Sequence, residues 1–246
     1  MSYIKQGDCI SLLADVPDGS IDMVLTDLPY GRTRNKWDSQ IPLDILWPEL
    51  IRVTKNRAAM VFFSQMPFTA KLVESNLDMF KYEWIWHKEL GTGFLNSHHA
   101  PLKIHENILV FSKAAAAYVK DPQNAMMYNP QMRTGFKPYV TRQRSLSENY
   151  DVSWQKSTES KSENGDRWPI DVIHFGHDRS GLHPTIKPLD LCKYLISTYT
   201  NPGETVLDVC IGSGTTCLAA KELGRKYVGF EIDESYYKLA KERLEA

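Results

Sequence analysis

The sequence predicts an α/β fold with a mostly parallel central sheet. Short apolar runs with the period of strands alternate along the 246 residues with stretches that have the period of helices. Late in the chain, the turn Gly212-Ser213-Gly214 stands between an apolar run and a helical stretch. Apolar residues make up 42% of the chain, which is enough to fill the core of one large domain or of a domain with an insertion.

The elements are predicted from periodicity. The β-like runs are Ile21–Thr26, Ala58–Ser64, Tyr82–His87, Asn107–Phe111, Thr205–Asp208 and Lys226–Glu231. The helical stretches are Leu43–Val53, Phe68–Asn76, Leu189–Tyr199, Thr215–Leu223 and Glu234–Leu244. Between about Pro122 and Trp168 neither pattern persists, and the stretch is polar with few apolar anchors. A loop of that length indicates either function or disorder.

Composition narrows the class of protein. The four cysteines form no CxxC pair and no disulfide-dense pattern, which favours a reduced, intracellular protein without a structural zinc site. The N-terminus lacks the apolar core of a signal peptide, and no apolar run has the length of a membrane span. We therefore expect a cytoplasmic protein without a membrane partner. The net charge of −1 does not by itself indicate a nucleic-acid partner.

The segment ETVLDVCIGSGTTCLAAKELGRKYVGFEID reads as strand, glycine turn, helix, strand and acid. The glycines let the backbone approach a ligand, and the N–H groups at Thr215 can bind it. Glu231 ends the next strand, where nucleotide-binding α/β folds place an acid against ribose hydroxyls. A plain turn is the alternative, but Asp208 and Glu231 on either side favour a nucleoside ligand. No third glycine completes GxGxxG, so S-adenosylmethionine, which has adenosine but no phosphate, fits better than a dinucleotide.

The position of this segment is unusual. In a doubly wound sheet the glycine strand normally comes first, whereas here only one more strand follows it, so the N-terminal part must supply the others. Ligands bind outside the carboxyl ends of parallel strands. Asp27, at the end of Ile21–Thr26, should therefore face the same crevice as Gly212–Gly214, and two distant segments should share one site.

Four motifs resemble those of the β-class amino-methyltransferases of DNA, in that family's order. They are IKQGDCISLLADVPDGSIDMVLTD, TDLPYG, HPTIKP, and LDVCIGSGTT with YVGFEID. The resemblance covers nearly the whole chain apart from about 122–168. It implies a permuted Rossmann-like S-adenosylmethionine-dependent methyltransferase sheet, with a single methyltransferase domain over 1–246 and a target-recognition insertion at 112–170. Two motifs depart from the family: Leu28 replaces a proline, and the usual DPFxGSG reads DVCIGSG.

The resemblance implies that TDLPY holds the reacting amine. An exocyclic amine is a poor nucleophile, because its lone pair is delocalised into the base. Asp27 and the backbone carbonyl of Leu28 can each accept one amine N–H and aim the lone pair at the methyl group. Pro29 fixes φ and biases Leu28 towards an extended conformation, and Tyr30 offers a flat face to a flipped base. In isolation such a motif is more often a plain turn, but the other motifs favour the catalytic interpretation.

The resemblance also implies the cofactor-binding residues. In the family the HPTIKP segment closes over the methionine end of the cofactor, so Thr185 and Lys187 are candidates for binding its carboxylate. The acid at position 8 usually lies near the adenine. The full candidate set is Asp8, Cys9, His183, Thr185, Lys187, Asp208, Gly212, Ser213, Gly214, Thr215 and Glu231. No histidine cluster has the spacing and the carboxylate partner of a metal site, so no metal is expected.

A basic and aromatic region indicates where nucleic acid binds. Between Lys103 and Arg144, seven Lys or Arg residues stand against two acids, with tyrosine and phenylalanine between them. Such a region can follow a phosphate backbone and stack on bases, although a solvated surface insert explains the composition equally well. The candidate DNA-binding residues are Arg133, Lys137, Arg142 and Arg144, with Arg32, Arg34 and Lys36 after the catalytic turn.

These observations predict a methyltransferase that acts on double-stranded DNA. Asp rather than Ser at position 27 favours adenine N6 as the target, by analogy with the family, where Ser-Pro-Pro variants are common among cytosine enzymes. The alternatives are an N4-cytosine DNA methyltransferase, an RNA amino-methyltransferase and a non-enzymatic DNA-binding module of the same fold. The sequence leaves open whether the chain forms a homodimer.

Overall fold

The computed structural model describes residues 2–31, 39–117, 119–142, 159–178 and 186–246. They form two compact units: the first comprises Met1–Asn129 and Asp171–Ala246, and the second comprises Pro130–Ile170. The sequence analysis began the insertion at residue 112, but the segment from there to Asn129 belongs to the first unit.

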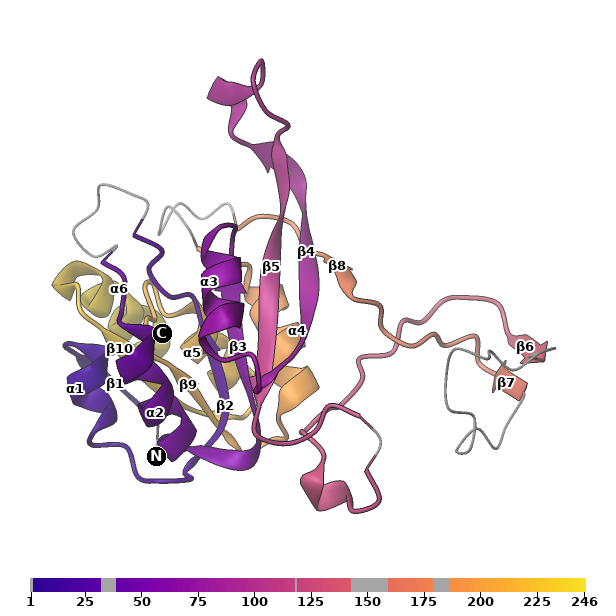
Figure 1. Cartoon of the computed structure of the whole chain (residues 1–246), viewed down its shortest axis with the longest axis horizontal. Coiled ribbons are helices and arrows are strands. Elements are labelled where there is room, and N and C mark those ends of the chain that lie inside the picture. The colour runs from indigo at the N-terminus through magenta and orange to yellow at the C-terminus, as the bar shows by residue number, and fades with distance from the viewer. Residues whose placement is uncertain (1, 32–38, 118, 143–158, 179–185) are drawn as a thin grey trace. The chain divides into compact units, whose positions relative to one another are not determined.

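The first unit contains an eight-stranded sheet (Figure 1) with the order β1-β10-β9-β2-β3-β5-β4-β8. Its strands are β1 (Tyr3–Gln6), β2 (Ile21–Thr26), β3 (Thr54–Ser64), β4 (Phe80–Thr92), β5 (Lys103–Ser112), β8 (Val172–His174), β9 (Thr205–Asp208) and β10 (Lys226–Glu231). Strand β5 is antiparallel to β3 and β4, and the other neighbouring pairs are parallel. The glycine strand β9 thus lies beside the N-terminal strand β2, which confirms the permuted α/β sheet.

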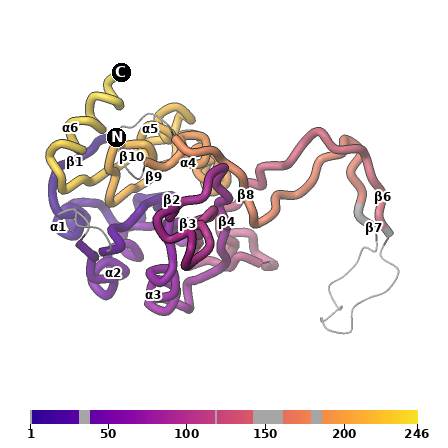
Figure 2. Tube along the Cα trace, turned by 90° about the horizontal axis from the view of Figure 1, so that it is seen from above, coloured from indigo at the N-terminus to yellow at the C-terminus, as the bar shows by residue number. Residues whose placement is uncertain are grey.

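Helices cover both faces of this sheet (Figure 2). They are α1 (Cys9–Leu13), α2 (Leu43–Val53), α3 (Phe68–Ser75), α4 (Leu189–Tyr199), α5 (Thr215–Glu222) and α6 (Glu234–Glu245), with short 3₁₀ turns at Phe94–Asn96 and Pro122–Asn124. Neighbouring strand residues point to opposite faces. Phe62 packs in the cluster that includes α1, α2 and α3. Phe63 packs in the cluster that includes α4 and α5. Within the described ranges, none of these helices has the length and apolar character needed to cross a membrane.

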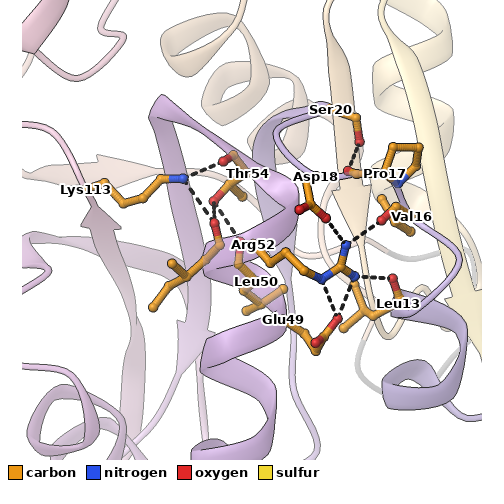
Figure 3. A network of polar contacts seen from close by, with 11 residues as sticks. Leu13, Val16, Pro17, Asp18, Ser20, Glu49, Leu50, Arg52, Thr54 and Lys113 are labelled. Atoms are coloured by element: carbon orange, nitrogen blue, oxygen red, sulfur yellow. Dashed lines mark hydrogen bonds and ion pairs between the residues drawn. The ribbon is translucent and has the colours of Figure 1, made fainter.

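Polar contacts fix the end of α2 (Figure 3). The guanidinium group of Arg52 donates to the carbonyl oxygens of Leu13 and Val16, both at 2.8 Å. Lys113 donates to the carbonyl of Thr54 at 2.5 Å and to that of Ile51 at 3.1 Å. These lysine contacts satisfy carbonyl groups that a helix end leaves without partners. The basic region predicted from residue 103 onwards is therefore divided, because its first part is a central strand and Lys113 binds a helix end.

The second unit contains a two-stranded antiparallel sheet, β6 (Tyr139–Arg142) and β7 (Glu159–Ser162). Arg133 and Arg167 exchange backbone hydrogen bonds, both 2.8 Å long. The side chain of Arg167 donates to the carbonyl of Lys137 at 2.8 Å, and its guanidinium group lies 4.1 Å from the centre of the Tyr139 ring. Arg167 thus organises this unit, although no motif in the sequence indicated it.

Candidate active site

A cavity lies at the carboxyl ends of the central strands. Asp27 follows β2 directly, Asp208 is the last residue of β9, and Glu231 is the last residue of β10. Because these strands are parallel neighbours, the three carboxyl groups share one edge of the sheet. Together with Gly212 and Ser213 they line a cavity of about 550 Å³. The structure thus brings the two predicted segments together.

The buried side chain of Glu231 fixes the glycine turn. Its Oε2 accepts the N–H of Gly212 at 2.8 Å, and its Oε1 accepts the N–H of Asp233 at 2.9 Å. Gly214 has a φ of 81°, and a Cβ atom there would lie 2.9 Å from the Cβ of Ala240, so the turn requires glycine. Each oxygen of Glu231 keeps a second lone pair that can accept a ligand hydroxyl.

Arg243 of α6 holds the other side of the same turn. Its Nη1 donates to the carbonyl oxygen of Ser213 at 2.5 Å, to Ser213 Oγ at 3.1 Å and to Thr215 Oγ1 at 3.3 Å. Ser213 and Thr215 are buried and line the cavity. Their orientation is therefore set by a residue 30 positions away from Ser213. The sequence predicted the helix but gave no signal for this contact.

The N-terminal residues complete the cavity wall. Strand β1 lies beside β10, and the N–H of Gly7 donates to the carbonyl of Glu231 at 2.8 Å. Asp8 caps α1, where its Oδ2 accepts hydrogen bonds from the N–H and the hydroxyl of Ser11, both at 2.8 Å. Cys9 is buried, and both Asp8 and Cys9 line the cavity.

Burial sets the electrostatics of this edge. It raises the pKa of Asp208 to about 6, even though the N–H of Cys210, which donates to Oδ1 at 3.0 Å, acts in the opposite direction. Burial also raises the pKa of Glu231, against the effect of the N–H groups of Asp233 and Gly212. Carboxylates desolvated in this way gain from any hydroxyl or amine donor that a ligand brings.

Among the described residues, two donors hold the carboxylate of Asp27. The hydroxyl of Tyr30 donates to Oδ1 at 2.6 Å, and the ammonium group of Lys187 donates to Oδ2. Burial raises the pKa of Asp27, and the charge of Lys187 partly offsets this effect. Tyr30 and Lys187 therefore orient the carboxylate of Asp27 before a substrate enters.

The rest of the TDLPYG turn is tied to the core. Leu28 is 3% exposed and belongs to the buried cluster that contains α1, α2 and α3, which explains how leucine replaces a proline. The ring of Tyr30 stacks on Phe68 of α3, with centres 5.0 Å apart and an interplanar angle of 30°. The carbonyl of Tyr30 accepts a hydrogen bond from Gln40 at 2.7 Å. One face of the predicted base platform is thus covered by the protein itself.

Known proteins resemble this chain in sequence and fold. The sequence profile of a family of DNA methylases that act at N6 or N4 matches residues 21–242. The chain belongs to this DNA methylase family. The DNA adenine methyltransferase YhdJ of Escherichia coli strain K12 is 28% identical over 98% of this chain and 82% of its own length. The crystal structure of the M1.HpyAVI-SAM complex has a TM-score of 0.65 at 22% identity and covers 100% of both chains. The cytosine-N4-specific PvuII DNA methyltransferase has a TM-score of 0.67 at 17% identity, over 98% of this chain and 85% of its own.

In the methylase, Lys187 has partners that the sequence analysis did not expect. It was a candidate for binding the carboxylate of the cofactor, and that role stays a prediction. In the structure its ammonium group contacts Asp27 and lies 3.7 Å from Glu106 Oε2. Glu106 also pairs with Lys88 of the neighbouring strand. Two sequence features could have indicated this pair: Lys88 in WIWHK and Glu106 in HENILVF. Charged residues in otherwise apolar strands are rarely buried without a partner.

The structure describes only part of the predicted DNA-binding set. Lys137 is exposed, while Arg133 is half-buried and donates from Nε to the carbonyl of Trp168 at 3.1 Å. The predicted residues outside the described ranges are Arg32, Arg34, Lys36, Arg144, His183 and Thr185, together with the side chain of Arg142. Within the described ranges, no three or more His, Cys, Asp or Glu side chains are grouped so that they could hold a metal ion.

Proposed function

We propose that this DNA methylase transfers a methyl group to the N6 amine of adenine in double-stranded DNA, with Asp27 as the residue that receives the amine. The observation that carries the proposal is the cavity itself. Asp27 and the glycine turn with Glu231, which are separated by most of the chain, line the same space of about 550 Å³. A volume of this size suits a cofactor-sized ligand.

The donor set of the cavity fits S-adenosylmethionine. Glu231 offers acceptors for the ribose hydroxyls, Asp8 and Cys9 line the wall near it, and the backbone at Gly212 allows close approach. When bound, the cofactor supplies a sulfonium methyl group, whose carbon bonds to the amine nitrogen while the carbon–sulfur electron pair stays on sulfur. We assign the adenosine half to this set of residues.

The chain's own part is to orient the amine and remove its proton. Asp27 Oδ2 and the carbonyl of Leu28 each accept one amine N–H, so the nitrogen lone pair turns out of the base plane. Hydrogen bonds of this kind strengthen as positive charge develops on nitrogen. After transfer, the surplus proton on the amine passes to the carboxylate of Asp27 and then to water. Tyr30 keeps that carboxylate in position through its hydroxyl, 2.6 Å from Oδ1.

The duplex must deliver a flipped base to this site. Tyr30 lines the cavity and its ring packs on Phe68, and we assign the flipped base to this part of the cavity wall. The exposed side chain of Lys137 and the guanidinium group of the half-buried Arg133, both in the second unit, are assigned to phosphate or base contacts. The relatives point to either base: YhdJ is an adenine enzyme by name and PvuII a cytosine-N4 enzyme. The aspartate at position 27 favours adenine.

The test is a methylation assay on three substrates. Duplex DNA, single-stranded DNA and RNA are incubated with S-adenosylmethionine, and the nucleosides are analysed by mass spectrometry, with sequencing to map the modified site. We expect N6-methyldeoxyadenosine, formed fastest on duplex DNA. N4-methyldeoxycytidine would replace the adenine assignment, a preference for RNA would overturn the substrate, and binding of DNA without any methylated product would indicate a non-enzymatic module.

A further inference from the structure

A buried chain of alternating charges leads away from Asp27. Lys88 on β4 and Glu106 on β5 are each 6% exposed and pair with one another. Glu106 in turn faces Lys187, which contacts Asp27. The order Lys88, Glu106, Lys187, Asp27 thus alternates cation and anion. The function proposed above uses only the last member of this series.

The two oxygens of Glu106 differ in their contacts. Oε1 accepts a hydrogen bond from Lys88 and one from Gln65, the latter at 2.9 Å. Oε2 is buried and has no hydrogen-bond partner among the described residues. It lies 3.7 Å from the ammonium nitrogen of Lys187, which is within ion-pair range but beyond the 2.7–2.9 Å of a charge-assisted hydrogen bond. A movement of roughly 1 Å would close that gap.

The surrounding charges keep both groups ionised. Burial alone would raise the pKa of Glu106, but the ammonium groups of Lys187 and Lys88 lower it overall. Burial alone would lower the pKa of Lys187, but Asp27 and Glu106 together raise it. Lys187 therefore stays a cation, which can pair with the carboxylate of either Asp27 or Glu106.

Substrate entry creates competition at Asp27. The carboxylate already accepts hydrogen bonds from Tyr30 and Lys187. An incoming amine can use a second lone pair of the same carboxylate, but the positive charge that develops on its nitrogen is repelled by an ammonium group on that carboxylate.

We propose that Lys187 changes partner when the target amine arrives, leaving Asp27 Oδ2 and forming a hydrogen bond to Glu106 Oε2. Glu106 is then a positioning residue that acts through Lys187, and Lys88 and Gln65 hold it in place. This inference rests on the proposed function, because it assumes an amine at Asp27.

A double-mutant cycle tests the coupling. Glu106→Gln is combined with Lys88→Met, so that no unpaired buried ammonium is left, and the pair is measured with and without Lys187→Met. With Lys187 present, we expect the single-turnover methylation rate to fall about tenfold or more, because the lysine then stays on Asp27. Without Lys187 the same pair should change the rate less than about twofold. Equal losses of methylation rate with and without Lys187→Met would show that Glu106 has only a structural role. Cofactor affinity and the unfolding midpoint are measured for each variant.

A spectroscopic measurement covers the case in which Lys187→Met is inactive. The ¹⁵N ammonium signal of Lys187 is recorded in the wild-type chain with S-adenosylhomocysteine and duplex DNA carrying the mapped site. We expect this signal to shift, and not to shift when the target adenine is replaced by purine, which lacks the amine. Identical signals with both duplexes would overturn the partner change. Wild-type protein that methylates nothing would instead refute the proposed function.

Discussion

Lys187 donates a hydrogen bond to Asp27, which lies 160 positions earlier in the chain. This contact joins the HPTIKP segment to the TDLPYG turn, two motifs that the sequence analysis treated as serving different ligands. A change at either residue should therefore affect the chemistry at the amine before it affects the binding of adenosine, which the proposal assigns to Glu231 and the residues near it.

We expect Asp27→Asn to lower the methylation rate at least about a hundredfold, because the neutral amide lacks the negative charge that stabilises the positive charge developing on the amine nitrogen. The dissociation constant of S-adenosylmethionine, measured by calorimetry, should change less than about threefold. Asp44→Asn, on the exposed start of α2, serves as the matched control. A variant with wild-type turnover would remove Asp27 from the reaction.

Glu231→Gln should weaken the binding of S-adenosylmethionine by about 1.5–3 kcal/mol, the usual contribution of hydrogen bonds to a charged acceptor. The side-chain amide would also place its NH₂ group against the backbone N–H of Gly212 or of Asp233, from which Glu231 now accepts hydrogen bonds. Calorimetry measures the affinity, and circular dichroism shows whether the variant is folded. Glu222→Gln, in the more exposed ion pair with Lys193, is the control. Unchanged affinity in a folded Glu231→Gln variant would exclude this residue from the binding site.

Asp208→Asn should stabilise the fold at neutral pH. Burial raises the pKa of Asp208 from 3.8 to about 6, so the folded state binds this proton more tightly than the unfolded chain does. The native protein therefore loses stability as pH rises from about 4 to about 6, and the loss persists above that range. A neutral amide should recover up to about 3 kcal/mol at pH 7.5 and almost nothing at pH 4. Chemical denaturation at both pH values measures this gain, with exposed Asp78→Asn as the control. An equal gain at both pH values would mean that the charge is not its cause.

The sequence predicted the central strands well, because a strand that is buried on both faces appears in the sequence as a nearly continuous apolar run. The bounds of β2, β9 and β10 agree with the predicted runs. The sequence analysis missed β1 and β8, which have four and three residues and lie at the two edges of the sheet. It also made β4 and β5 too short, because their polar ends extend past the neighbouring strands as a hairpin (Figure 1).

The residues of the site could be predicted only where a sequence motif marked them. Glycines and acids at strand ends mark a ligand edge from local sequence alone. The partners of those residues come from tertiary packing, as when Arg243 reaches Ser213, or Glu106 faces Lys187. No local pattern encodes which buried charges meet across a fold, so the contacts of Lys187 with Asp27 and Glu106 were not expected, although its place near the active site was.

Gly165→Ala should disrupt the second unit and leave the first intact. Gly165 has a φ of 82°, and a Cβ atom there would lie 1.8 Å from the carbonyl oxygen of Phe136. Gly135 has a similar φ of 85°, but a Cβ atom there meets nothing within 4 Å, so Gly135→Ala is the matched control. We expect the Gly165 variant to bind S-adenosylmethionine normally and to lose at least about tenfold in DNA affinity, the control losing much less. If both variants bind DNA equally well, the second unit does not recognise the target.

The last prediction concerns how the second unit would bind DNA. Lys137 has an exposed side chain, and its structural contact is made by its backbone carbonyl, so Lys137→Met should leave the fold unchanged. If its ammonium group neutralises a phosphate, the variant should weaken binding equally on all sequences and reduce the slope of log affinity against log salt by about one.

Arg133 is different, because its Nε donates to the carbonyl of Trp168 while, among the described residues, its other guanidinium donors stay available for a guanine edge. Arg133→Lys should therefore reduce discrimination at one base by about 1–3 kcal/mol. Binding is measured by titration at several salt concentrations and on single-base variants of the mapped site, with Lys161→Met of the same unit as the control. Wild-type behaviour of both variants in both series would move DNA binding to other residues, of which Arg32, Arg34 and Lys36 are the next to test.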